Sequence, residues 1–208
     1  MKFVKDGALI VFEGIDGTGK STQLKLLEKS LLDEGYRVIT TREPTGGVYG
    51  LEIRALYQDR GSVSLEEELE LFIKDRREHV ATLIEPSMAG GSIVISDRYF
   101  LSSAAYQGAA GLDPEIILSR NSFAPNPDLA LILEIDVEEG IRRITEKRGD
   151  VLNDFEQTES LKKVDSIFRN MNCDYIRRVD ATGSIDQIAT QIKQLCQLML
   201  AEKNTLSR

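Results

Sequence analysis

The chain has 208 residues, of which 41% are hydrophobic and 29% are charged, a composition typical of a folded globular protein and unlike that of a disordered segment. Its 34 acidic and 26 basic side chains give a formal net charge of -8, which disfavours binding to duplex nucleic acid or to an anionic membrane. Two cysteines and one histidine are too few for a structural zinc site. No apolar run reaches the roughly 20 residues of a membrane span. We therefore expect a cytoplasmic protein with reduced thiols.

Five short runs rich in β-branched and aliphatic residues alternate with helical patterns along the chain. The runs span residues 8–13, 37–41, 92–96, 129–135 and 175–179. The helical patterns lie at about 20–34, 48–59, 65–85, 113–122, 137–147, 158–171 and 184–202. This alternation predicts an α/β fold with a five-stranded parallel sheet and helices on both faces. No repeat or linker interrupts the pattern, so we expect one domain over residues 1–208.

Several predicted helices have recognisable ends. Gly35 follows the first helix as a stop signal. Ser64, Asp113 with Pro114, and Ser184 are typical of helix N-termini.

The segment after the first strand, GIDGTGKS at residues 14–21, matches the phosphate-binding pattern G-x-x-x-x-G-K-[ST] between a strand and a helix. Glycines let the backbone turn tightly and direct its N–H groups at phosphate oxygens. Lys20 can then reach the β- and γ-phosphates, and the Ser21 hydroxyl can bind Mg²⁺. The expected ATP-binding residues are Gly14, Ile15, Asp16, Gly17, Thr18, Gly19, Lys20, Ser21 and Thr22. The motif alone leaves open a GTPase, a motor ATPase and a small-molecule kinase; a glycine-rich turn with a solvated lysine is the alternative.

Charged residues near the carboxyl ends of strands indicate a second binding site. The third strand leads into Asp97 and Arg98, which we interpret as a Mg²⁺ ligand and a phosphate clamp; an exposed ion pair is the alternative. Asp16 faces either a sugar hydroxyl of the phosphate acceptor or a loop N–H that it caps. Arg42, in the segment TREP, follows the second strand at the same edge, where a plain turn is the alternative.

Two further segments carry side chains suited to a nucleoside. In the predicted helix 65–85, Phe72 and Arg76 lie one turn apart in an apolar stripe and could offer a base an aromatic face and a hydrogen-bond donor. A core phenylalanine beside an arginine that reaches solvent is the alternative. After the third strand, the side chains suited to a nucleoside are Ser102, Ser103, Tyr106 and Gln107, which offer hydroxyl groups, an amide and an aromatic face. Exposed polar residues are the alternative.

Residues 142–163 concentrate basic side chains in an acidic chain. They are Arg142, Arg143, Lys147, Arg148, Lys162 and Lys163. Such a segment can act as a lid that closes over ATP and stabilises charge on the transferred phosphoryl group. A solvated charged surface with nearby acids is the alternative.

Together with this basic segment, an ordered set of strings resembles the thymidylate kinase family over almost the whole chain. The strings are FEGIDGTGKSTQ, TREP, LFIKDRREHV, SDRY with SSAAYQG, PDLALIL and DATGSID. The resemblance implies the P-loop NTPase fold, the substrates ATP and dTMP, Mg²⁺ as cofactor, a homodimer and a role in dTTP synthesis. It also implies that residues 180–184 lie beside the adenine of ATP.

For the acceptor, the resemblance implies that Asp16 and Arg98 contact the sugar and phosphate of dTMP. Phe72 would stack on thymine, and Arg76 and Gln107 would meet its polar edge. The full expected dTMP-binding set is Asp16, Arg42, Phe72, Arg76, Arg98, Ser103, Tyr106 and Gln107.

The chain departs from the family pattern in the lid. Some members carry an arginine inside the phosphate loop, where this chain has Gly17, and others supply the catalytic cation from a lid motif similar to D-R-x-E. The corresponding residues 153–156 read NDFE, without the arginine. We therefore predict Arg148, and then Arg143, as the lid catalyst. The expected catalytic residues are Lys20, Arg98, Arg148 and Arg143.

Two other activities compete with this interpretation. A GTPase switch normally reads guanine with an N-K-x-D motif, which the sequence lacks. A kinase of deoxynucleosides, or of another monophosphate such as dUMP, is closer, because the thymine methyl group is worth only about 1–3 kcal/mol in a fitted pocket.

Overall fold

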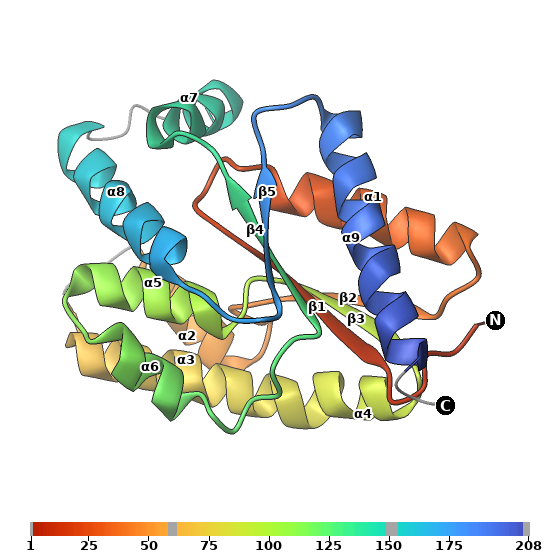
Figure 1. Ribbon diagram of the computed structural model, residues 1–208. Coiled ribbons are helices and arrows are strands. Elements are labelled where there is room, and N and C mark those ends of the chain that lie inside the picture. The colour runs from red at the N-terminus through yellow and green to blue at the C-terminus, as the bar shows by residue number, and fades with distance from the viewer. Residues whose placement is uncertain (1, 58–61, 149–153, 206–208) are drawn as a thin grey trace.

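The computed structural model describes residues 2–57, 62–148 and 154–205, and a parallel sheet runs through its centre (Figure 1). The strands are β1 (Ala8–Glu13), β2 (Val38–Arg42), β3 (Ile93–Asp97), β4 (Leu129–Glu134) and β5 (Ile176–Asp180). Their order is β2-β3-β1-β4-β5, and every neighbouring pair is parallel. The predicted α/β class and five-stranded parallel sheet are therefore confirmed.

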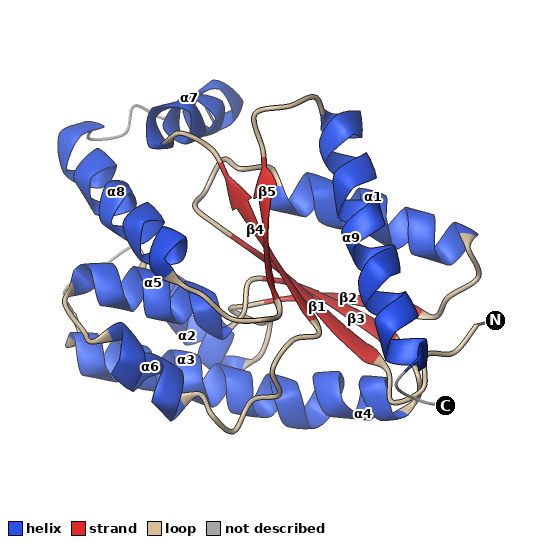
Figure 2. Cartoon of the chain, in the orientation of Figure 1, coloured by secondary structure: helices blue, strands red, loops and turns tan. Residues whose placement is uncertain are grey.

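Helices cover both faces of this sheet. They are α1 (Lys20–Asp33), α2 (Val48–Leu56), α3 (Leu65–His79), α4 (Glu85–Ala89), α5 (Phe100–Ala110), α6 (Pro114–Arg120), α7 (Val137–Arg148), α8 (Asp154–Asn170) and α9 (Ile185–Thr205). Figure 2 shows α1 and α9 together on one side of the sheet and α3, α5, α6 and α8 on the other. Within the described ranges, no helix is both long enough and apolar enough to cross a membrane.

The central strand explains why most strand sequences are apolar throughout. All six residues of β1 are buried, because β3 and β4 flank it and helices cover both its faces. The edge strand β5 differs: Ile176 and Val179 are buried, whereas Arg177 and Arg178 are exposed. A strand with one open edge needs fewer apolar residues, which agrees with the mixed sequence YIRRV.

The predicted helix starts are confirmed where the side chains form caps. The Ser64 hydroxyl accepts from the Glu67 N–H at 3.3 Å, and the Glu67 carboxylate accepts from the Ser64 N–H at 2.8 Å, so α3 begins in a capping box. Asp113 caps α6 by accepting from the Glu115 N–H at 2.9 Å. Gly35, which follows α1, has a φ of 87° that suits a glycine stop.

Two helical segments differ from the prediction. Helix α5 was not among the expected helices, because Phe100 to Ala105 are all buried and the few polar residues of the segment give only a weak helical pattern. The predicted helix 65–85 is instead α3 followed by a π-helical turn, Val80–Ile84, and then α4. Periodicity alone cannot reveal such a turn, since the helix continues through it.

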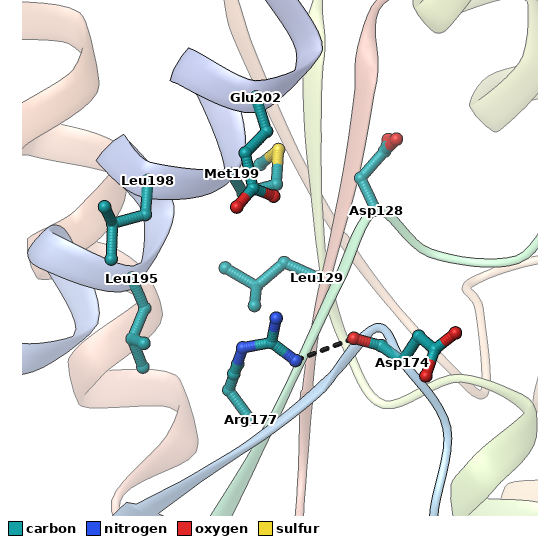
Figure 3. A pocket seen from close by; sticks show the side chains of 8 residues that line it. All are labelled: Asp128, Leu129, Asp174, Arg177, Leu195, Leu198, Met199 and Glu202. Atoms are coloured by element: carbon teal, nitrogen blue, oxygen red, sulfur yellow. Dashed lines mark hydrogen bonds between the residues drawn. The ribbon is translucent and has the colours of Figure 1, made fainter.

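The parallel sheet gives the molecule two distinct edges. The carboxyl ends of β1, β3 and β5, at Glu13, Asp97 and Asp180, meet at one edge, where open parallel sheets bind ligands. A hollow at the opposite edge, between the starts of β4 and β5 and helix α9, is shown in Figure 3. There Arg177 donates to the backbone carbonyl of Asp174 at 2.7 Å. The phosphate loop follows the carboxyl end of β1, so this hollow lies at the other end of the strands from the loop.

Candidate active site

The phosphate loop joins β1 to α1 and closes around the Lys20 side chain. Its ammonium group donates to the backbone carbonyls of Gly14 at 3.0 Å and Ile15 at 2.7 Å. The Thr18 hydroxyl also donates to the Ile15 carbonyl, at 3.0 Å. These bonds hold the loop in a compact ring at the N-terminus of α1, where backbone N–H groups and the helix dipole favour an anion.

Close backbone packing explains two of the loop glycines. Gly14 has a φ of 123°, and a Cβ there would lie 2.4 Å from the Leu133 carbonyl oxygen. Gly17 has a φ of 84°, and a Cβ there would lie 2.2 Å from the Gly140 carbonyl oxygen in α7. The loop therefore packs directly on α7. This contact and the left-handed φ of Gly17 disfavour any side chain at that position, including the loop arginine mentioned above.

Burial changes the acidity of Lys20. Loss of hydration lowers its pKa to about 7, and the nearby Arg98 charge adds to the effect. Phosphate oxygens at this position would favour the charged form.

A hydroxyl and a carboxylate meet where a metal–phosphate complex would lie. The Ser21 hydroxyl donates to Asp97 Oδ2 at 2.6 Å, joining the start of α1 to the end of β3. Both groups are hard oxygen donors of the kind that Mg²⁺ prefers. Thr22 follows on α1 and is exposed.

Arg98 lies between the phosphate loop and α5. Its guanidinium donates to Asp16 Oδ1 at 2.6 Å, to the Tyr106 hydroxyl at 3.2 Å and to the Gly14 carbonyl at 3.3 Å. It also donates to the Ser102 hydroxyl at 3.0 Å. The structure thus brings together Asp16, Arg98 and Tyr106, which are three of the residues expected to bind the acceptor. Burial raises the pKa of Tyr106 to about 12, so its hydroxyl stays protonated.

Sequence reasoning missed Glu13, which supports the turn that carries Arg98. This carboxylate is buried at the end of β1 and accepts from the backbone N–H groups of Tyr99 at 3.0 Å and Ser102 at 3.3 Å. It also accepts from the Ser102 hydroxyl. Burial raises its pKa to about 7, although the bonds from Ser102 and the charge of Arg98 oppose that shift. An acid that ends an apolar strand directly before the loop was the available signal.

Arg76 is only 1% exposed and lies in a polar network. Its Nε and Nη2 atoms donate to Glu43 Oε2 at 2.9 Å and 2.6 Å, and Nη1 donates to Asn121 Oδ1 at 2.5 Å. Nη2 also donates to the Ser103 hydroxyl at 3.0 Å. The alternative in which Arg76 reaches solvent is therefore wrong. The roles of Glu43 and Asn121 were not expected, because both residues lie far from Arg76 in the sequence.

The remaining predicted acceptor residues lie around this network. Phe72 is half-buried one turn before Arg76 on α3. Gln107 is 5% exposed on α5, and its Nε2 donates to Glu68 at 3.0 Å. Arg42 is exposed at the end of β2, where it is paired in register with Asp97. All of these residues therefore belong to the elements that border the carboxyl edge of the sheet.

Part of the predicted lid falls within the described residues. The Arg143 side chain donates to Glu139 at 2.8 Å and to the Ala181 carbonyl at 3.3 Å, which joins α7 to the segment after β5. Arg142 pairs instead with Glu139 and Glu146. Arg148 is the last residue of α7, but its side chain lies outside the described part of the chain, as do the side chains of the NDFE segment.

The segment expected beside adenine forms a short turn. Asp180 Oδ1 accepts from the Thr182 N–H at 2.9 Å and from its hydroxyl at 2.7 Å. Gln187 Oε1 accepts from the Ser184 N–H at 2.9 Å, so the start of α9 is capped. This turn follows β5 at the same edge of the sheet as the phosphate loop.

Comparison with known proteins gives a consistent result. The sequence profile of the family described as Thymidylate kinase matches residues 12–192. A thymidylate kinase of Desulfotalea psychrophila is 56% identical over 196 residues, which is 92% of this chain and 97% of that protein. Thymidylate kinases of Xanthomonas euvesicatoria pv. vesicatoria and Xanthomonas oryzae pv. oryzae are 44% and 43% identical, over 95% of this chain and 86% of each relative.

Proposed function

The chain belongs to the thymidylate kinase family, whose enzymes phosphorylate dTMP, and from that membership we propose that its phosphate loop holds ATP while Arg98 and its neighbours hold dTMP. The reaction is attack by a phosphate oxygen of dTMP on the γ-phosphorus of ATP. The bond from that phosphorus to the β–γ bridging oxygen breaks, giving dTDP and ADP without a covalent enzyme intermediate. Catalysis then depends on positioning and on charge neutralisation.

On the donor side, backbone N–H groups of residues 14–22 surround the phosphates of ATP. The Lys20 ammonium exchanges its bonds to the loop carbonyls for bonds to β- and γ-phosphate oxygens. Ser21 and Asp97 would hold Mg²⁺, and their oxygens, 2.6 Å apart, fit an ion that otherwise binds phosphate oxygens and water. When bound, Mg²⁺ neutralises charge on the phosphate oxygens.

On the acceptor side, Arg98 binds the phosphate of dTMP and Asp16 accepts from its sugar. Thymine stacks on Phe72 and meets Arg76 and Gln107 at its polar edge. The remaining acceptor-site residues in the proposal are Arg42, Ser103 and Tyr106. The guanidinium group of Arg98 is planar and carries several N–H donors, so it can bind two phosphate oxygens at once.

One observation supports this arrangement more than any other. The Arg98 guanidinium contacts both the Gly14 carbonyl, at 3.3 Å, and the Asp16 carboxylate, at 2.6 Å, within the phosphate loop itself. An acceptor phosphate on Arg98 is therefore a direct neighbour of a donor phosphate on the loop, as a direct transfer requires.

A coupled assay of ADP formation tests the proposal. The purified protein is given ATP with dTMP, dUMP, dCMP, dGMP, thymidine or no acceptor. We expect the highest kcat/KM with dTMP, a lower value with dUMP and almost no ADP formation with thymidine or without an acceptor. ATP consumption that no monophosphate accelerates would contradict the proposal, and acceleration by thymidine alone would indicate a nucleoside kinase.

We further propose that the basic segment 142–163 acts as a lid of this single kinase domain and supplies a cation to the transferring phosphoryl group. Arg148 is the first choice, because Arg143 already bonds to Glu139 and to the Ala181 carbonyl. Arg148→Ala should lower kcat by about 10²-fold or more with little change in the KM for ATP. Arg143→Ala should lower kcat less. Arg142→Ala, which removes the ion pairs with Glu139 and Glu146, is the matched control. A wild-type kcat in Arg148→Ala would contradict the assignment.

We also propose that the enzyme is a homodimer of the cytoplasm, where it takes part in dTTP synthesis. Exposed apolar side chains on two packed helices, α2 and α3, support the dimer: Val48 is 64% exposed, Leu51 58% and Leu65 38%. Free cysteines at positions 173 and 196 suit a reducing compartment. Cell fractionation followed by the dTMP kinase assay tests the location, and recovery of the activity outside the cytoplasmic fraction would contradict it.

A further inference from the structure

Helices α3 and α5 are joined by two polar bridges. Glu68, Phe72 and Arg76 lie at successive intervals of four residues on α3, so they share one face of that helix. Ser103 and Gln107 are likewise four residues apart on α5. Arg76 donates to Ser103 at 3.0 Å, and Gln107 donates to Glu68 at 3.0 Å. Phe72 therefore lies between the two bridges, where the proposed function places the thymine ring.

The bridge at Glu68 fixes the orientation of the Gln107 amide. An ionised carboxylate can only accept hydrogen bonds, so the Gln107 NH₂ group must face Glu68. The carbonyl oxygen then points away from it. Gln107 is 5% exposed, and its Oε1 is buried without a hydrogen-bond partner in the described part of the chain. A buried carbonyl oxygen without a partner is available to accept a hydrogen bond from a bound molecule.

Arg76 supplies the complementary group at the other end. Within the described residues, the hydrogen bonds from Arg76 to Glu43, Asn121 and Ser103 use four of the five N–H donors of its guanidinium. The α3–α5 face therefore offers an acceptor at Gln107, and Arg76 keeps one N–H donor that these four bonds do not use. Thymine and uracil carry a hydrogen on ring atom N3 and a carbonyl at C4, whereas cytosine carries an N3 acceptor and a C4 amino group.

We propose that Glu68 is a positioning residue that sets base selectivity. By holding the Gln107 NH₂ group, it keeps the amide carbonyl available to the N3–H of thymine or uracil and opposed to the N3 lone pair of cytosine. The inference rests on the proposed placement of dTMP. It extends that placement because Glu68, which need not touch the base, would determine the preference for thymine or uracil over cytosine.

Replacing the carboxylate with an amide tests the inference. In Glu68→Gln the new side chain can donate as well as accept, so Gln107 can turn over and present either group to the base. We expect the ratio of kcat/KM for dTMP to that for dCMP to fall by about tenfold or more, mainly through the KM for the monophosphate. The KM for ATP should stay within twofold of the wild-type value. Glu68→Ala, which removes the acceptor altogether, should show the same loss of selectivity.

Glu70→Gln is the matched control. Glu70 lies on the same helix but pairs with the half-buried Arg120 instead of Gln107, so its replacement should leave the selectivity ratio unchanged. Calorimetric titration with dTMP and with dCMP gives an independent measure of binding, and thermal melting verifies that the variants are folded. Equal losses for dTMP and dCMP in both Glu68 variants, or no loss, would overturn the inference alone. Failure of the wild-type protein to phosphorylate dTMP would overturn the proposed function and this inference with it.

Discussion

Arg98 combines a constrained backbone with a functional side chain. Its φ of 74° is in the left-handed region, which costs a non-glycine residue of the order of 1–2 kcal/mol. Neighbouring bonds hold it there: the Arg98 N–H donates to the Phe12 carbonyl at 2.9 Å, and its carbonyl accepts from the Ser96 hydroxyl at 2.7 Å. Glu13 fixes the next residues by accepting from the Tyr99 N–H. The strained turn therefore directs the guanidinium back over the phosphate loop.

Arg98→Ala should impair the reaction with dTMP without weakening the binding of ATP. Removing the guanidinium takes away the proposed phosphate clamp but leaves the backbone of the loop, so kcat/KM for dTMP should fall by about 10²–10³-fold. Calorimetry should give an ATP affinity within twofold of the wild-type value. Arg120→Ala, which removes only the surface pairs with Glu66 and Glu70, is the control. Equal losses of ATP binding and turnover in Arg98→Ala would argue against this division of roles.

The buried Lys20 should make stability depend on pH. Its folded-state pKa, about 7, lies below the ordinary value of 10.5, so the unfolded chain binds the proton more tightly between these values. Unfolding therefore takes up a proton in this range, and the wild-type protein should gain stability relative to Lys20→Met as pH rises from about 7 towards 10. At about 1.4 kcal/mol for each pKa unit, the gain should be about 3–4 kcal/mol.

Urea unfolding at pH 6.5, 8 and 9.5 measures this difference in the free energy of unfolding. Lys25→Met is the control, because Lys25 is exposed on the same helix. A difference between wild type and Lys20→Met that stays constant, or that shrinks as pH rises, would show that burial does not lower the Lys20 pKa.

At the scale of elements, the phosphate loop and α7 form one packed unit. The Gly17 backbone lies against Gly140 in α7, and Arg143 in the same helix bonds to the Ala181 carbonyl after β5. Helix α7 is thus attached to the phosphate loop and to the segment that the family resemblance places beside adenine. A side chain at Gly17 should therefore displace α7. The cost of that displacement can be measured apart from the cost of a left-handed φ angle at a residue other than glycine.

Gly17→Ala and Gly19→Ala make this separation possible. Both glycines have left-handed φ angles, 84° and 91°, so either substitution costs about 1–2 kcal/mol of strain. A Cβ at Gly17 also lies 2.2 Å from the Gly140 carbonyl oxygen, whereas a Cβ at Gly19 meets no atom within 4 Å. Gly17→Ala should therefore lose at least about 1 kcal/mol more unfolding free energy in urea titrations. Equal losses in the two variants would contradict the contact with α7.

At the scale of the whole molecule, the apolar residues that remain exposed point to association. Val48 and Leu51 are three residues apart, so they share one face of α2, and α2 packs against α3, which carries Leu65. Val48 and Leu51 therefore give α2 an exposed aliphatic surface, which is typical of interfaces. A second copy of the chain is the partner in our proposal, since a two-fold interface places the same surface of each subunit in contact.

Leu51→Asp should break the dimer. Placing a carboxylate in an apolar interface leaves a charge without water or a partner, so sedimentation at micromolar concentration should change from a dimer to a monomer. Leu198→Asp introduces the same charge at a site that is 62% exposed on α9, beside the hollow in Figure 3, and should leave the dimer intact. A monomeric wild-type protein, or a dimeric Leu51→Asp variant, would contradict the proposed interface.

Local sequence determined much of this fold. Apolar strands, helix caps at Ser64 and Asp113, and the glycine-rich phosphate loop depend on residues within a few positions of each other, so their patterns can be read directly. The same patterns placed the chain in its family. The parallel order of the strands then required that the loop and Asp97 lie at one edge of the sheet.

The partners of the buried charges were decided only by tertiary structure. Arg76 finds Glu43 and Asn121 at separations of 33 and 45 residues, and Glu13 finds Ser102 at a separation of 89. Such pairs form because burial makes an unpaired charge costly, and burial depends on how distant helices pack. Helix α5 was missed for a related reason: it is buried on most sides, so most of its residues are apolar or small and the helical pattern in its sequence is weak.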